Sequence, residues 1–151
     1  MVLSVPWRIA QVLIIGAAPL AFSAWQTATL MAILFHHSNI ELPLSVERWL
    51  CRLVMTPRMH GIHHSIVEQE THSNWSTIFA WPDYAHGTYR INIPQHNLTI
   101  GVPEYRDANE LAFAEIVTMP FGQERASWKT PHGGKPERTE LPELPPSTLA
   151  R

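Results

Sequence analysis

The chain has 151 residues and a formal net charge of −2, and 45% of its residues are hydrophobic. This length suffices for one domain, and the slightly negative charge gives no electrostatic footprint for binding nucleic acid. The single cysteine, Cys51, excludes a disulfide within the chain and a cysteine-rich zinc module.

The first predicted element is a long apolar run over residues 9–35, which carries no formal charge. At about 1.5 Å per residue, a helix of this length reaches roughly 40 Å, more than the roughly 30 Å hydrocarbon core of a bilayer. It therefore predicts a membrane helix that tilts, kinks near residues 16–19, or places its last turn in the interface. A secretory signal and a buried helical hairpin are the alternatives. The run is long for a signal, and no small-residue cleavage site precedes the first histidines.

A second helix is expected over residues 44–55, where Arg48 and Arg52 fall on a different stripe from the apolar side chains. The apolar stripe consists of Val46, Trp49, Leu50, Leu53 and Val54. This pattern is typical of a helix in the membrane interface with its arginines toward lipid headgroups. An ordinary amphipathic helix that covers a protein core has the same periodicity. Because more arginines follow the apolar run than precede it, the positive-inside rule places the histidine-rich part in the cytoplasm.

The third element carries three histidines, His60, His63 and His64, at a spacing that brings them onto one face of a helix. Neutral imidazole is a common ligand of transition metals, and no cysteines or paired carboxylates accompany it as in thiolate zinc or calcium sites. Thr56 is the expected N-cap and Pro57 the first helical residue. The pattern predicts a metal site, with a solvated histidine-rich helix end as the alternative.

The remainder of the chain predicts a cap with few regular elements. Residues 75–89 mix aromatics with proline and glycine, and short alternating pieces at 89–93 and 98–100 have a strand-like pattern. A further helix is expected over 108–118. From residue 122 to 151 the chain is rich in proline, glycine and charge, which predicts a disordered tail. The expected fold class is all-α.

Five separated segments carry a resemblance to a known family. They are FHHSN at residues 35–39, TPRMHGIHHS at 56–65, ETHSN at 70–74, DYAHGTYR at 83–90 and IGVPEYRD at 100–107. In order and spacing, they resemble the C-terminal half of the fatty acid hydroxylase superfamily, the sterol desaturase-like membrane di-iron oxygenases. The resemblance covers residues 9–121 and implies one domain over 1–121, with a membrane helix at 9–35 and a histidine-rich cap at 36–121.

The resemblance implies a helical membrane protein whose cytosolic face holds two irons between histidine clusters. Such a protein uses dioxygen and electrons from a separate reductase to hydroxylate or desaturate a lipid, as an oxidoreductase of lipid biosynthesis. Matched by position, the ligands are His37 of the H-S-N segment together with His60, His63 and His64. His36 is expected to be a supporting or accidental neighbour. Two further residues, Asn74 and Asp83, are candidates for orienting imidazole N–H groups or for capping a turn.

One departure from the family pattern concerns the number of histidines. The earlier HxxxH and HxxHH clusters of the family lie upstream of the H-S-N segment, and no histidine precedes His36 here. Because four imidazoles cannot complete a two-metal cage, we expect a truncated or split form, with the missing clusters on a separate chain. The alternatives are a non-catalytic membrane-anchored metal-binding or scaffold protein and a lipid-interface protein without metal. Surface or packing positions are expected for His72, His86, His96 and His132.

Overall fold

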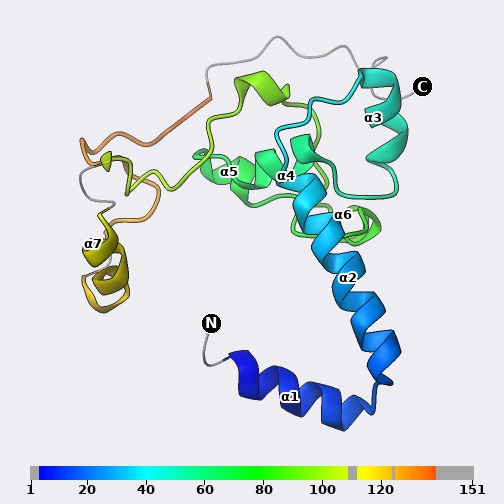
Figure 1. Ribbon diagram of the computed structural model, residues 1–151. Helices are drawn as coiled ribbons and strands as arrows, with labels where there is room; N and C mark the ends of the chain where they lie inside the picture. Colours follow the sequence, from blue (N-terminus) through cyan, green and yellow to red (C-terminus); the bar gives the residue numbers. More distant parts are fainter. Residues whose placement is uncertain (1–3, 109–111, 124, 139–151) are drawn as a thin grey trace.

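The computed structural model describes residues 4–108, 112–123 and 125–138, and these residues are helical with no strand (Figure 1). The helices are α1 (Ser4–Ile15), α2 (Pro19–His36), α3 (Leu44–Leu50), α4 (Pro57–His63), α5 (Glu68–Thr71), α6 (Trp81–His86) and α7 (Phe113–Thr118), with 3-10 turns η1 (Gln95–Asn97) and η3 (Met119–Phe121). The all-α prediction is confirmed for this part of the chain. The strand-like piece at 98–100 makes only an isolated bridge, between Ile100 and Ser65.

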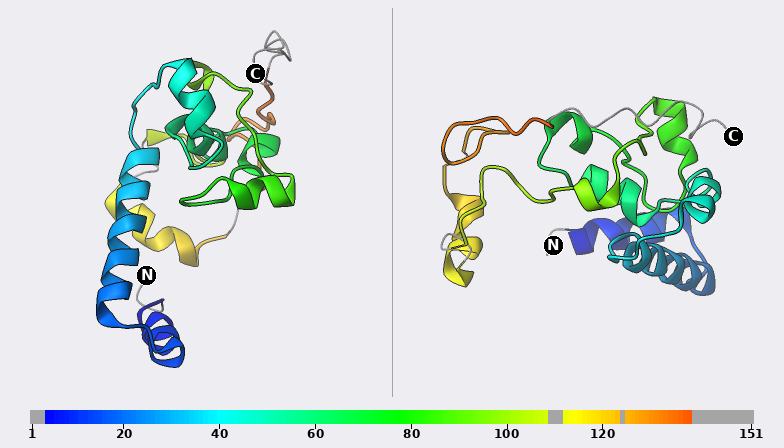
Figure 2. Two further views of the ribbon diagram at one scale, coloured as in Figure 1. Left: turned by 90° about the vertical axis from the view of Figure 1, so that its right-hand side faces the viewer. Right: turned by 90° about the horizontal axis from the view of Figure 1, so that it is seen from above.

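The long helix predicted over residues 9–35 is two helices in the structure, and this prediction is corrected. Helix α1 ends at Ile15, Gly16 has a φ of 65°, and α2 begins at Pro19. Glycine adopts a positive φ readily, and proline lacks the N–H that would continue the helical hydrogen bonds. The chain therefore turns at residues 16–18, so that α1 lies across the end of α2 (Figures 1 and 2). Among the described residues, no helix has both the length and the apolar character needed to cross a membrane.

Helices α1 and α2 expose their apolar side chains to an unusual degree. Their exposed large hydrophobic residues are Val5, Trp7, Ile9, Leu13, Ile14, Ile15, Leu20, Phe22, Trp25, Leu30, Met31, Ile33 and Leu34. The only buried residue of α2 is His36, at the end that enters the cap. The described part of the chain thus leaves both helices without a protein core around them.

The cap consists of α3 to α6 and the segments between them, and it lies at the far end of α2 (Figures 1 and 2). Helix α4 is its centre, because it contacts α2, α5 and η1. The buried core contains Cys51, Met55, Met59 and Ala80, with Tyr89 packed against it. Helix α3 ends at Leu50, earlier than the predicted residue 55, and it exposes Val46, Trp49 and, just beyond its end, Leu53.

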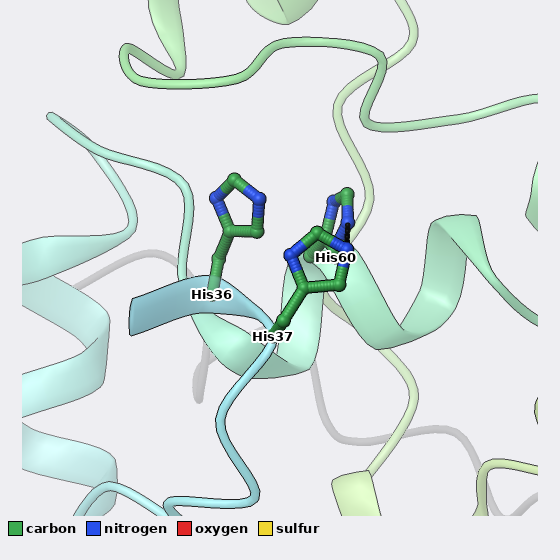
Figure 3. A group of neighbouring side chains, drawn as sticks. All are labelled: His36, His37 and His60. Atoms are coloured by element: carbon green, nitrogen blue, oxygen red, sulfur yellow. Dashed lines mark hydrogen bonds between the residues drawn. The ribbon is translucent and has the colours of Figure 1, made fainter. Parts of the chain in front are cut away.

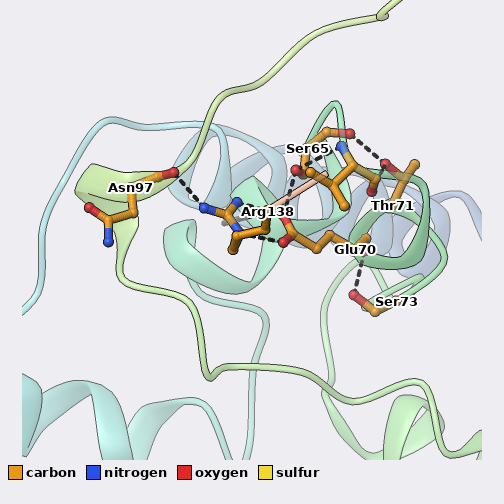
Figure 4. Close-up of polar contacts among 7 residues, drawn as sticks. Ser65, Glu70, Thr71, Ser73, Asn97 and Arg138 are labelled. Carbon is orange, nitrogen blue, oxygen red and sulfur yellow. Dashed lines mark hydrogen bonds and ion pairs between the residues drawn. The ribbon is translucent and has the colours of Figure 1, made fainter. Parts of the chain in front are cut away.

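Two described residues of the segment 122–151, which the sequence predicts to be a disordered tail, contact the cap. The guanidinium of Arg138 donates to both carboxylate oxygens of the buried Glu70 and to the backbone oxygen of Asn97 (Figure 4). Lys135 adds an ion pair with Glu68 at 2.6 Å. A two-pronged arginine contact of this kind offsets the loss of hydration of a buried carboxylate. Residues 139–151 lie outside the described part, as do 109–111 of the predicted helix 108–118, of which α7 is the observed portion.

Candidate metal centre

Two helix termini bring three histidines together. His36 is the last residue of α2, His37 caps that helix, and His60 lies on α4 (Figure 3). The ring nitrogens that they offer as ligands all lie within 4.8 Å of one another. At the end of α2, the N–H of His37 still bonds to the carbonyl of Ile33, and the N–H of Ser38 bonds to that of Phe35.

Local sequence fixes the direction of α4 and hence of its histidines. The Oγ1 atom of Thr56 accepts a hydrogen bond from the N–H of Met59, and Pro57 occupies the first turn, as the sequence predicts. Met59 and Ile62 are fully buried in the cap. Because they hold one side of α4 in the core, His60 faces the end of α2.

The ring nitrogens of the centre are close enough to share one ion. The Nε2 atom of His60 lies 3.0 Å from Nε2 of His37 and 2.9 Å from Nε2 of His64. Nitrogens that bind one metal ion at about 2.0–2.1 Å are roughly 2.9–3.4 Å apart for right-angled to tetrahedral geometry. Nδ1 of His37 lies 2.9 Å from the carbonyl oxygen of Ile33. A carbonyl only accepts, so Nδ1 carries the proton and the lone pair of Nε2 faces His60.

His63 stands beside this group. Its ring centroid is 5.6 Å from that of His60 and 4.8 Å from that of Trp75, with which it makes a T-shaped contact. Its Nδ1 donates to the carbonyl of Ser73 at 2.9 Å, which leaves Nε2 as the atom able to bind a metal. The tightest group in the described residues is therefore His36, His37 and His60, with His64 in contact and His63 adjacent. The predicted set lacked His36, since sequence spacing alone does not show which of two consecutive histidines turns inward.

Burial lowers the pKa of three imidazoles of the centre, those of His36, His60 and His64. Burial, aided by the neighbouring His37, lowers the pKa of His36 to about 4, although a hydrogen bond to the backbone of Thr77 acts in the opposite direction. Burial and the surrounding histidines lower the pKa of His60 to about 3, and burial also lowers the pKa of His64. At neutral pH the lone pairs are thus available to a metal. Nδ1 of His36 is buried without a hydrogen-bond partner, an arrangement that costs free energy unless an unseen partner binds it.

The structure gives Asn74 and Asp83 partners other than imidazoles. Asn74 is fully buried with a φ of 52°, and its side chain binds the carbonyl of Met59 and both backbone polar groups of Arg90. Asp83 accepts hydrogen bonds from the N–H groups of Trp75 and Ser76 and from the hydroxyl of Thr88. Of the two predicted roles, Asp83 has the turn-capping one. Asn74 instead holds the backbone next to His60.

The remaining histidines lie away from the centre. The side chains of His72 and His96 are 55% and 68% exposed, and both His86 and His132 are also exposed. His72 contacts Trp75 and Trp128 rather than the other histidines. Their positions agree with the surface or packing roles predicted for them.

The sequence also matches a family model, described as fatty acid hydroxylase, over residues 1–88. The chain belongs to the fatty acid hydroxylase family. The match spans α1 to α6 and all the histidines of the centre, so it confirms the resemblance seen in the sequence. Membership supports a lipid hydroxylase-type oxidoreductase in general, and the IGVPEYRD segment at 100–107 lies beyond the matched residues. No curated protein and no solved structure matches the chain.

Proposed function

We propose that this fatty acid hydroxylase contributes a histidine-ligated iron centre to the oxidation of a lipid. The observation that carries the proposal is the convergence of His36, His37 and His60 within 4.8 Å. The family is known for di-iron sites, and iron is among the metals that imidazole suits. A lipid is the substrate class that family membership supports.

In this proposal the ligands are His37, His60, His63 and His64, and His36 joins them. The carbonyls of Ile33 and Ser73 hold the Nδ1 protons of His37 and His63, which leaves the Nε2 atom of each ring for the metal. Carbonyl partners of this kind fix the orientation of a ligand ring and raise its basicity. The burial of His36 and His60 keeps water away from one side of the centre.

Bound iron would supply reductive activation of dioxygen for attack on a lipid C–H bond, with electrons from a separate reductase. The side chains of the chain hold the metal in place and keep their imidazoles unprotonated. Hydroxylation and desaturation both begin with removal of hydrogen from carbon, and the proposal covers either product.

We further propose that α1 and α2 lie in membrane lipid with the histidines on the cytoplasmic side. Support comes from the apolar side chains along both helices, which the described residues leave exposed. A two-iron centre needs more ligands than His37, His60, His63 and His64 provide. We therefore propose that further histidine clusters, on another segment or a separate chain, complete the centre against these helices.

Cobalt(II) titration of the untagged protein in detergent tests the centre, since ligand-field absorption reports binding without any activity. We expect the wild type to bind, and His60→Ala to weaken binding by more than about tenfold. His96→Ala is the matched control, because this exposed side chain lies outside the group. Equal cobalt affinity of His60→Ala and the wild type would refute the centre.

Oxygen consumption coupled to lipid oxidation tests the activity. We expect iron, a reductase and the chain carrying the additional clusters to be required together, and His37→Ala to abolish the coupled reaction. Steady turnover by the 151-residue chain alone would contradict the need for further clusters.

A further inference from the structure

A second site lies in the cap, in a pocket between α3 and the segment that follows α6. Its volume is about 480 Å³, and its lining includes Arg48, Arg52, Arg90, Tyr84, Tyr89 and Asn92. None of the histidines of the metal centre lines it. The pocket is therefore separate from the centre, and nothing in the proposed hydroxylation uses it.

The charge of this pocket is unbalanced. Three arginines, Arg48, Arg52 and Arg90, are among its lining residues, and no aspartate or glutamate is. Elsewhere in the described structure, two arginines with largely buried side chains have acidic partners: Arg58 has Glu47, and Arg138 has Glu70. Within the described ranges, no ion pair is found for Arg48, Arg52 or Arg90. Positive charges that share a pocket repel one another, and a bound anion relieves this repulsion.

The pocket is held in shape before any ligand binds. The side chain of Asn74 fixes the backbone of Arg90 on both sides, through bonds of 2.9 Å to its N–H and 2.7 Å to its carbonyl. Tyr84 and Tyr89 stack with their ring centroids 4.0 Å apart and an interplanar angle of 18°. A pocket with rigid walls loses little conformational entropy when a ligand enters.

We propose that the arginine pocket binds the phosphate group of an anionic lipid. Guanidinium groups form paired hydrogen bonds with phosphate oxygens. A phosphate monoester carries about −1.5 to −2 charge and three acceptor oxygens, so it can engage several arginines at once. The lipid origin of the phosphate follows from α3 and the residues just after it, where Val46, Trp49 and Leu53 are about half exposed or more. Exposed tryptophan and aliphatic side chains next to arginines are the pattern of a surface that enters the headgroup region.

The probe for this site is dihexanoyl phosphatidate, a short-chain lipid with a phosphate monoester, titrated into the detergent-solubilised full chain and followed by phosphorus NMR. We expect Arg52→Gln and Arg90→Gln each to weaken binding about tenfold or more. Arg106→Gln removes the same charge from an exposed position outside the pocket and should bind like the wild type. Circular dichroism and the cobalt(II) spectrum report whether each variant keeps its fold. If Arg90→Gln unfolds, Arg52→Gln, which changes an exposed side chain, still tests whether the pocket binds phosphatidate.

Two parallel titrations separate the sources of phosphate. Dihexanoyl phosphatidylcholine, whose headgroup is neutral overall, should bind at least about tenfold more weakly than the phosphatidate. Inorganic phosphate that binds as tightly as the phosphatidate, with the same arginine dependence, would overturn the lipid assignment in favour of a soluble phosphate. Phosphatidate binding that is absent, or unchanged in Arg52→Gln, would overturn the pocket itself.

Discussion

The cap and the helical pair α1–α2 bury their apolar residues very differently, although both are rich in them. In the cap, Met59 and Ile62 are 0% exposed, whereas Ile14 on α1 and Leu20 on α2 are 84% and 83% exposed. The cap thus has a buried core of its own, and the described residues provide none around the helical pair. Apolar composition alone does not distinguish these two situations.

The largest difference is expected from two methionine substitutions. Met59→Ala should lower the free energy of unfolding by about 2–5 kcal/mol, because it leaves a cavity beside Met55 in the core. Met31→Ala on α2 removes the same atoms from a side chain that is 60% exposed. This substitution should change the free energy of unfolding by less than about 0.5 kcal/mol. Denaturant titration in detergent, followed by tryptophan fluorescence, measures both. Equal effects would mean that α2 has a core of its own in solution.

The next effect concerns the buried amide of the cap. Asn74→Ala should lower the free energy of unfolding by about 2–4 kcal/mol, since it leaves the carbonyl of Met59 and the backbone groups of Arg90 without their partner. The control is Asn92→Ala, at an exposed position, which should be nearly neutral. The same denaturant titration applies. A neutral Asn74→Ala would show that water replaces this side chain.

A smaller effect is expected where the C-terminal segment joins the cap. Arg138→Gln should lower the free energy of unfolding by about 1.5–3 kcal/mol, because Glu70 keeps its bond from Ser65 but loses the charged hydrogen bonds from Arg138. A double-mutant cycle with Glu70→Gln isolates the pair, and the two changes should be clearly non-additive. Additive effects would mean that the segment is not held by this contact in solution.

The smallest expected effect is a loss of folding stability at low pH. Burial alone raises the pKa of Asp83, but hydrogen bonds from Ser76, Thr88 and Trp75 outweigh it and hold the pKa below the ordinary 3.8. The stability that this carboxylate contributes is therefore present above the unfolded-state pKa and is lost as pH falls through the lower folded-state value. Unfolding curves of wild type and Asp83→Asn should converge below about pH 4. Curves that stay parallel down to low pH would contradict the shift.

The sequence predicts the features that are determined by interactions between residues close together in the chain. Thr56 and Pro57 start α4 because a cap and an N-terminal proline act within one turn. The turn at Gly16 was one option among three, since local sequence permits a break but does not require it. Hydropathy is averaged over many residues, so a short break between two apolar helices does not show in it, and the sequence predicts α1 and α2 as one helix.

Contacts between distant residues could not be predicted in this way. Glu70 and Arg138 are 68 residues apart, and composition alone made the C-terminal segment look disordered. His36 joins the metal centre because α2 ends against α4, and consecutive residues at a helix end differ in direction by about 100°. Which of His36 and His37 is buried depends on that packing; in the structure His36 is buried and His37 is exposed, yet both belong to the group with His60.

One amide side chain touches the surroundings of both sites. Asn74 binds the carbonyl of Met59, the residue before His60, and the backbone of Arg90 in the phosphate pocket. The Asn74 side chain is therefore a direct link of hydrogen bonds between the backbone of one proposed site and the residue that precedes a proposed ligand of the other. If both sites bind as proposed, any coupling between them through this link has the same free energy in both directions.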